Sequence, residues 1–205
     1  DDRDHYPSGL ALAPDGSAVY VGSYEDTNDL YVAYVRAEQS DGTYETISEV
    51  HLTGEAETYE RFAGLTFDGD GRFFAVYTRF DMGRTKPSVF GIYTGVPSDS
   101  STFELVDIVD NYDSDDAIYV RYGIVAHPRG IVFADAYTKT PEDGSWDTDP
   151  SRSRQLYAGD ETGFEMVAED TTYPQRGKVM LVDDAGKLWR GSADGLHVLS
   201  CWAAQ

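Results

Sequence analysis

The stretch Leu10–Tyr24, which reads LALAPDGSAVYVGSY, contains the pattern that decides the fold of this chain. Two alternating apolar runs, Leu10–Ala13 and Ala18–Tyr24, flank the turn Pro14-Asp15-Gly16. Because successive side chains of a strand point to opposite faces, each run can place one face on a core. Proline presets the first φ of a turn and glycine accepts a positive φ, so the stretch predicts a β-hairpin.

The hairpin pattern recurs along the chain. It returns in Gly64–Tyr77 (GLTFDGDGRFFAVY), Gly123–Tyr137 (GIVAHPRGIVFADAY) and Lys178–Gly191 (KVMLVDDAGKLWRG). The turn glycines are Gly16, Gly71, Gly130 and Gly186, at spacings of 55, 59 and 56 residues. A second pattern recurs at Thr43–Ile47 (TYETI), Thr102–Val106 (TFELV) and Gly163–Val167 (GFEMV), with its aromatic residues 59 and 61 residues apart. Two patterns that keep one period indicate a repeat architecture.

The repeats predict strands in four units, with no helical periodicity longer than a turn or two. The expected strands are Leu10–Ala13, Ala18–Tyr24, Leu30–Arg36 and Tyr44–Val50; Leu65–Phe67, Phe73–Arg79, Ser88–Thr94 and Phe103–Val109; Tyr122–Ala126, Ile131–Thr138, Gln155–Ala158 and Phe164–Ala168; and Lys178–Val182, Lys187–Gly191 and Leu196–Trp202. Four-stranded antiparallel units in series are typical of an all-β propeller. We expect a single β-propeller domain over residues 1–205, with about four blades near 5–52, 60–110, 118–170 and 172–205. A β-sandwich is the alternative, although a sandwich gives no reason for a fixed period.

The two end units raise the question of ring closure. The last unit has no clear fourth strand, and the first unit begins directly with a first strand. Open sheet edges are a liability, so propeller rings are expected to close. The sequence therefore predicts either a compact four-bladed ring with an incomplete blade, or part of a larger ring that further blades or subunits complete.

The composition limits the partners of the chain. With 37 acidic and 16 basic residues the net charge is −21, which repels nucleic-acid phosphates and anionic lipid, so neither partner is expected. No run of apolar residues is long enough to span a membrane. Aspartate outnumbers glutamate about two to one and lysine is scarce, which resembles proteins of salt-loving microbes. Cys201 is the only cysteine and excludes an internal disulfide. We expect an extracellular, cell-surface or virion protein of a halophilic system.

Three short segments resemble a known repeat motif. Gln39–Tyr44 reads QSDGTY, Pro97–Phe103 reads PSDSSTF and Gly159–Phe164 reads GDETGF. They resemble degenerate copies of the Asp-box of sialidase-like (BNR) β-propellers. The resemblance implies that Asp41, Asp99 and Asp160 staple hairpins away from the functional face. Ser192-Ala193-Asp194-Gly195 is a candidate fourth copy, in which case Lys187–Gly191 would be a third strand.

The starts of the four first strands are the candidate binding site, because the funnel of a propeller lies where these strands begin. The candidate ligand-binding residues there are His5, Tyr6, Arg61, Phe62, Arg121, Tyr122, Tyr173 and Arg176. Guanidinium groups pair with carboxylates, and aromatic faces stack on sugars or cations. The resemblance to sialidase-like enzymes implies that Arg61, Arg121 and Arg176 hold a substrate carboxylate. In the alternative interpretation the aromatics pack between blades and the arginines contact local carboxylates.

Catalysis needs further groups near this funnel. Glycoside cleavage uses two carboxylates, or a tyrosine nucleophile with a carboxylate partner. The candidates are Asp4, Glu60, Tyr122, Tyr173 and Asp135, and a lyase would need a base such as His5. None of them lies in a motif that assigns its role. His127 falls in a turn and is expected at the surface. The sequence shows no Ser-His-Asp order, no phosphate-binding glycine loop and no His/Cys metal spacing.

An acidic cluster between the second and third units is a candidate calcium site. Asp110, Asp113, Asp115 and Asp116 lie in DNYDSDD, and Ca²⁺ prefers such oxygen ligands. The alternative is an exposed acidic linker.

Taken together, these features favour a non-enzymatic recognition or assembly module, extracellular or on a virion surface, that binds glycans or a surface partner through the funnel. The alternatives are a polysaccharide-acting glycoside hydrolase or lyase of sialidase-like type, and a purely structural spacer.

Overall fold

The computed structural model describes residues 5–16, 18–25, 31–51, 58–81, 88–112, 117–118, 123–139, 153–170, 180–192 and 195–199. Every regular element in these ranges is a β-strand, so the described part of the chain is all-β. No helix that could cross a membrane is found among them.

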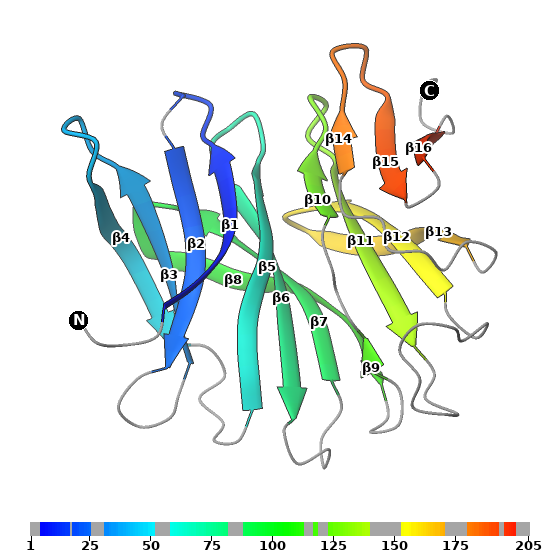
Figure 1. Ribbon diagram of the computed structural model, residues 1–205, viewed down its shortest axis with the longest axis horizontal. Helices are drawn as coiled ribbons and strands as arrows, with labels where there is room; N and C mark the ends of the chain where they lie inside the picture. The colour runs from blue at the N-terminus through cyan, green and yellow to red at the C-terminus, as the bar shows by residue number, and fades with distance from the viewer. Residues whose placement is uncertain are drawn as a thin grey trace.

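Four antiparallel sheets follow one another along the chain (Figure 1). The first contains β1 (His5–Leu12), β2 (Ala18–Glu25), β3 (Tyr31–Glu38) and β4 (Tyr44–His51). The second contains β5 (Thr58–Phe67), β6 (Phe73–Asp81), β7 (Ser88–Val96) and β8 (Asp99–Tyr112). The third contains β10 (Gly123–Ala126), β11 (Val132–Lys139), β12 (Ser153–Asp160) and β13 (Gly163–Asp170), with β9 (Ala117–Ile118) paired to β11. The fourth contains β14 (Met180–Val182), β15 (Leu188–Ser192) and β16 (Gly195–Leu199).

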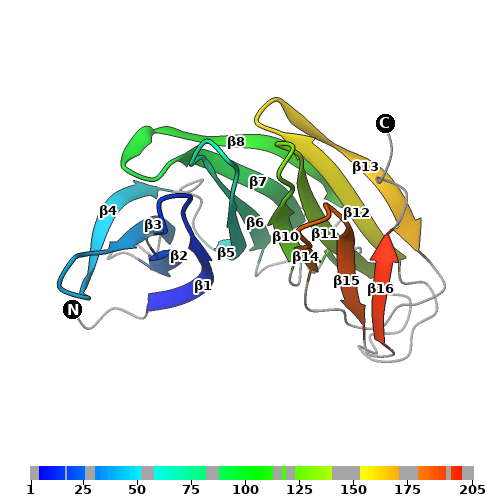
Figure 2. The ribbon, with the colours of Figure 1, turned by 90° about the horizontal axis from the view of Figure 1, so that it is seen from above.

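The four sheets stand side by side as an arc, like part of a fan (Figure 2). The first strand of each sheet lies innermost, and β1 contacts β5, β5 contacts β10 and β10 contacts β14. Each sheet therefore packs its face on the next sheet about a shared centre, and the sheets do not form the two layers of a sandwich. The prediction of an all-β propeller is confirmed, and we refer to each sheet as a blade.

Each blade opens with the same hairpin. In all four blades the turn ends at a glycine with a positive φ, and the value of φ ranges from 76° at Gly186 to 85° at Gly16. Its N–H donates to the carbonyl oxygen three residues earlier, as from Gly130 to His127 at 2.9 Å. The strand pairs on either side are in the same register, with Leu12 opposite Ala18 and Ala126 opposite Val132. The position of a residue relative to the turn glycine is therefore equivalent in every blade.

Glycines allow the inner strands to approach one another closely. Gly9, Gly64 and Gly123 each lie seven residues before the turn glycine of their blade. A Cβ on Gly9 would lie 2.9 Å from the backbone carbon of Gly64 and 2.9 Å from the backbone nitrogen of Leu65. A side chain on Gly9 would therefore force β1 and β5 apart.

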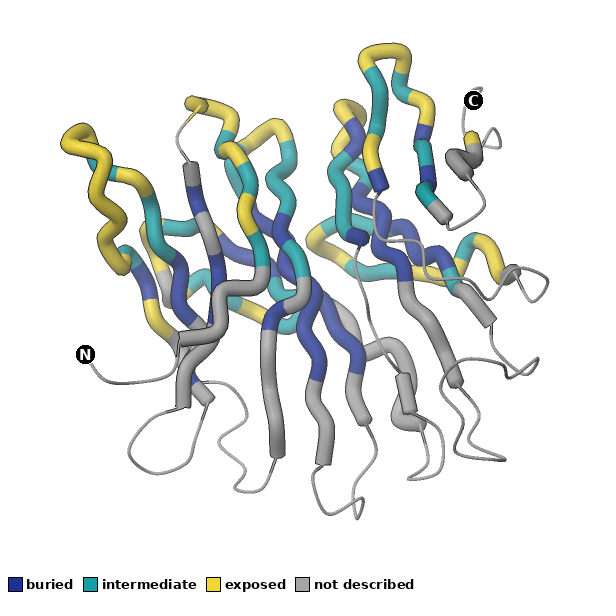
Figure 3. Tube along the Cα trace, viewed as in Figure 1, coloured by how far each residue is buried: buried dark blue, intermediate teal, exposed yellow. Residues whose placement is uncertain are grey.

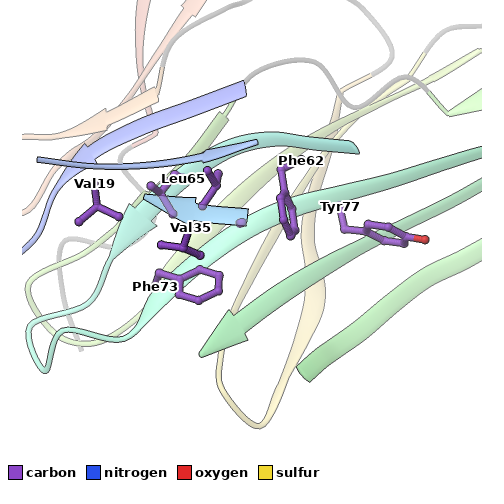
Figure 4. Close-up of a cluster of buried hydrophobic side chains, with 8 residues drawn as sticks. Val19, Val35, Phe62, Leu65, Phe73 and Tyr77 are labelled. Atoms are coloured by element: carbon purple, nitrogen blue, oxygen red, sulfur yellow. The ribbon is translucent and has the colours of Figure 1, made fainter. Parts of the chain in front are cut away.

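The core consists of the interfaces between consecutive blades, and exposed residues concentrate at the hairpin turns (Figure 3). Between the first two blades, Val19 and Val35 pack against Phe62, Leu65 and Phe73 (Figure 4). The ring of Phe62 also meets that of Tyr93 edge to face, with the centroids 5.6 Å apart. Burial of these aliphatic and aromatic side chains is the main driving force for blade stacking.

Two details differ from the sequence-based expectation. The strand β5 begins at Thr58, so Arg61 and Phe62 lie within it and not at its start. The short strand β9 adds a fifth strand to the third blade. In the last blade, β15 pairs with β14 across the first hairpin turn, which agrees with the expected second strand at Lys187–Gly191 and contradicts only the alternative that made it a third strand.

Candidate functional site

The inner strands of all four blades start on one side of the arc, which is the lower side in Figure 1. Several residues of the predicted site lie outside the described residues; they are Asp4, Arg121, Tyr122, Tyr173 and Arg176. The backbone of His5, Tyr6, Glu60 and Arg61 lies in the strands β1 and β5. The predicted ring of arginines and aromatics therefore stays a prediction.

Two of the predicted site residues have described side chains. The side chain of Phe62 is buried between the first two blades, which is the packing role that the alternative interpretation assigned to these aromatics. Asp135 lies in β11 directly opposite Gly123, the first residue of β10. The carboxylate of Asp135 is therefore level with the start of an inner strand.

Asp135 forms an ion pair with Arg190 of the fourth blade. Arg190 Nη2 donates to Asp135 Oδ1 at 2.5 Å, and Arg190 Nε donates to Oδ2 at 3.4 Å. Only 2% of Asp135 and 7% of Arg190 is exposed. Arg190 lies opposite Met180, the first residue of β14, so the pair joins the blades just beneath the face where β10 and β14 begin. Both oxygens of the carboxylate face the guanidinium, so the pair ties the third blade to the fourth.

The same location is apolar at the other two blade interfaces. Asp135 lies five residues after its turn glycine, and Arg190 lies four residues after its own. The equivalent residues are Val21 and Ala75 between the first and second blades, and Val76 and Ala134 between the second and third blades. An ion pair therefore replaces an aliphatic contact at one interface. Sequence inspection missed Arg190, although counting from Gly186 places a charge at a position that is alanine in the second and third blades.

A histidine links the turns of the third and fourth blades. His127 Nδ1 accepts a hydrogen bond from the N–H of Arg129 at 3.1 Å, and Nε2 lies 3.0 Å from the carbonyl oxygen of Gly186. Since a carbonyl can only accept, the tautomer with the proton on Nε2 satisfies both contacts. The expectation of a surface histidine is wrong: His127 is buried because the turn of the next blade covers it.

The three Asp-box-like aspartates adopt one common geometry. In each, Oδ1 accepts two hydrogen bonds from the residue two positions later, one from its backbone N–H and one from its hydroxyl. The pairs are Asp41 with Thr43, Asp99 with Ser101, and Asp160 with Thr162. They close the hairpin between the third and fourth strands of their blades, as Asx-turns do. These aspartates stabilise local turns.

Three turn carboxylates have a lowered pKa. Asp41 and Asp160 belong to the Asp-box-like turns, and Asp183 belongs to the first hairpin turn of the fourth blade. The hydroxyl and N–H of Thr43 lower the pKa of Asp41, and those of Thr162 do the same for Asp160. The indole Nε1 of Trp189 donates to Asp183 Oδ2 at 2.7 Å and is the main cause of the lowered pKa of Asp183. These hydrogen bonds favour the ionised carboxylate over the neutral acid.

We expect the hairpins to weaken in acid. Because the pKa of Asp41 and Asp160 is lower in the folded state, their contribution is complete above about pH 4 and is lost as the pH falls through the folded pKa. Urea unfolding at pH 6 and pH 3 tests this, with Asp41→Asn and Asp160→Asn together as the variant. Asparagine keeps an accepting oxygen but no charge, so the variant should be less stable than the wild type at pH 6, and this difference should shrink at pH 3. An equal difference at both pH values would contradict the assignment.

The predicted calcium ligands remain untested. Asp113, Asp115 and Asp116 lie outside the described residues, and only the backbone of Asp110 is described, in β8. Within the described ranges no three His, Cys, Asp or Glu side chains are grouped so that they could hold a metal ion.

Two solved structures of similar fold are named as an α-L-arabinanase and an α-L-arabinofuranosidase. The chain is similar to the α-L-arabinanase of Penicillium chrysogenum complexed with arabinobiose, with a TM-score of 0.59 and 14% identity over 91% of this chain and 56% of that one. It is also similar to the GH93 α-L-arabinofuranosidase of Fusarium graminearum complexed with arabinobiose, with a TM-score of 0.57 and 10% identity over 91% and 55%. The chain thus spans just over half the length of these proteins. No protein-family model matches the chain, and no curated protein matches it in sequence. The likeness is one of fold, and it supports the β-propeller architecture.

Proposed function

We propose that this chain is a β-propeller module that binds a glycan, without cleaving it, at the face where the inner strands begin. The observation that carries the proposal is the fold likeness, over 91% of the chain, to proteins solved with arabinobiose bound. The arginine and aromatic residues that the sequence places before or near the strand starts supply the chemistry for holding a sugar ring or a sugar carboxylate.

The state of Asp135 favours binding over hydrolysis. It is the one catalytic candidate whose side chain is described, and its carboxylate is paired with Arg190. A glycosidase needs two carboxyl groups, or a tyrosine and a carboxylate, that face the same bond. Hydrolysis is the second candidate function, because the structures of similar fold are named as arabinanase and arabinofuranosidase.

Binding can be tested with arabinobiose and with an array of neutral and uronate-containing glycans. We expect Arg61→Ala and Arg121→Ala each to weaken binding about tenfold, because each removes a charge-assisted hydrogen bond. Arg129→Ala is the matched control, since Arg129 is exposed in the turn at the opposite end of β10. Equal binding by all three variants would rule out the proposed face. Release of reducing ends from arabinan or a polyuronate by the wild-type chain would instead establish the hydrolase or lyase.

We further infer that the third-to-fourth-strand turns are degenerate Asp-boxes, since Asp41, Asp99 and Asp160 recur with one geometry at equivalent places. The acidic cluster at Asp110, Asp113, Asp115 and Asp116 stays a candidate calcium site, and a drop in melting temperature on chelation would support it.

We also propose an extracellular or virion-surface location in a high-salt setting, on the basis of the net charge of −21. Self-repulsion of this charge destabilises the folded state, and salt screens it, with a Debye length of about 3 Å at 1 M. The melting temperature should therefore rise steeply between 0.1 M and molar sodium chloride. A flat response in a thermal scan would contradict the halophilic interpretation.

A further inference from the structure

Each end of the arc exposes apolar side chains at positions that are buried at the interfaces between blades. In the second, third and fourth blades, the residues six and four positions before the turn glycine pack against the preceding blade. These residues are Leu65 and Phe67, Ile124 and Ala126, and Met180 and Val182. The equivalent residues of the first blade are Leu10 and Leu12, and they are 70% and 68% exposed. We call these two leucines the leading face.

The outer side of the fourth blade carries the complementary surface. Leu181, Trp189 and Val198 lie opposite one another across β14, β15 and β16. Leu181 is 41% and Val198 is 39% exposed. The residues equivalent to Trp189 are Val19, Phe74 and Phe133, and all three are fully buried beneath the next blade. We call this row of three side chains the trailing face.

The interfaces between consecutive blades show which surface packs against a leading face and which against a trailing face. At all three of them, the trailing side of one blade packs on the leading side of the next. The leading face of the first blade and the trailing face of the fourth blade stand at opposite ends of the arc (Figure 2). Within the chain, a leading side always packs on a trailing side, so these two faces are suited to pack against each other. Exposed apolar faces of this kind mark association sites.

We propose that the chain associates head to tail, with the leading face of one copy packed on the trailing face of the next. Such a contact is heterologous: two different surfaces meet, so each copy keeps one face free for a further copy unless a ring closes. The net charge of −21 opposes the approach of two copies at low ionic strength, so association should strengthen with salt.

The mass of the 205-residue chain, measured by sedimentation equilibrium in about 1 M sodium chloride, tests the proposal. We expect the mass to exceed that of one chain and to grow with concentration. The leading-face variant combines Leu10→Lys with Leu12→Lys, and the trailing-face variant combines Leu181→Lys with Val198→Lys. Each variant alone should weaken association at least about tenfold. All four positions are exposed, so the melting temperature of each variant, measured as a folding control, should stay close to that of the wild type.

A mixture of the two variants gives the sharpest result. Each variant retains one intact face, so neither should dimerise alone, and an equal mixture should form a dimer and nothing larger. An interface between like faces would instead let the variant that keeps that face dimerise without the other variant. Met166→Lys, at an exposed position of β13 away from both faces, is the matched control and should associate as the wild type does. A wild-type chain that stays monomeric at every salt concentration would overturn the proposal and favour further blades of a longer chain as the cover of both faces. Loss of association in Met166→Lys would overturn it as well.

Discussion

Replacing Asp135 by valine should lower the free energy of unfolding by about 3–5 kcal/mol, the cost typical of removing one partner of a buried ion pair. The substitution leaves the guanidinium of Arg190 buried between the third and fourth blades without the carboxylate that it contacts through two nitrogens. Arg190→Ala should cost a similar amount, because it leaves the Asp135 carboxylate buried without that guanidinium. Urea unfolding at constant salt measures both effects.

The double variant makes this prediction specific. Asp135→Val combined with Arg190→Ala recreates the Val/Ala contact that occupies the equivalent place at the other two interfaces, at Val21 with Ala75 and at Val76 with Ala134. We expect the double variant to be more stable than either single variant, because no uncompensated charge of the pair remains. Single-variant losses that simply add in the double variant would show that the two side chains do not stabilise each other.

The ion pair also favours the native arrangement of the blades over arrangements in which the fourth blade docks on another blade. Aliphatic contacts at the first two interfaces do not distinguish one blade from another. A fourth blade that docked on the wrong neighbour would bury Arg190 against a valine, at Val21 or at Val76, and would lack the partner carboxylate. The pair therefore favours one arrangement at the expense of others, a role for which buried polar groups have precedent.

Much of the fold could be predicted because its strongest signals are local. The turn of each first hairpin is determined by a glycine and its neighbours, as at Pro14-Asp15-Gly16, and the spacing of these glycines reveals the repeat. The two residues of β9 carry no periodicity, so this strand could not be predicted. The strand β5 extends back to Thr58 through Glu60 and Arg61, which lack the apolar alternation on which strand prediction depends.

The features of the site that were missed depend on contacts between distant residues. Arg190 and Asp135 are 55 residues apart in sequence, and neither lies in a local motif that suggests the other. His127 is buried by the carbonyl of Gly186, 59 residues away, and a turn position alone favours exposure. The sequence shows Phe62 as one of the repeating aromatic residues, but only the neighbouring blade determines that its ring is covered.

Gly9→Ala should destabilise the chain by about 1–3 kcal/mol, the usual cost of adding a methyl group to a tightly packed interface. The new Cβ would lie 2.9 Å from the backbone carbon of Gly64, and equally close to the backbone nitrogen and the Cβ of Leu65. Backbone atoms in the middle of β5 cannot rotate away, so the two inner strands must separate and the contact between the first two blades must loosen. The midpoint of urea unfolding should fall accordingly.

Three other glycines provide graded controls for this variant. At Gly123 the nearest atom is Met180 Cγ at 2.9 Å, and a methionine side chain can move, so Gly123→Ala should cost less. At Gly64 the nearest atom is Ile124 Cγ2 at 3.3 Å, and the cost should be smaller again. Gly69 has nothing within 4 Å, so Gly69→Ala should be close to neutral. If Gly9→Ala were as harmless as Gly69→Ala, β1 and β5 could not be in backbone contact, and the stacking of the first two blades about a common centre would be wrong.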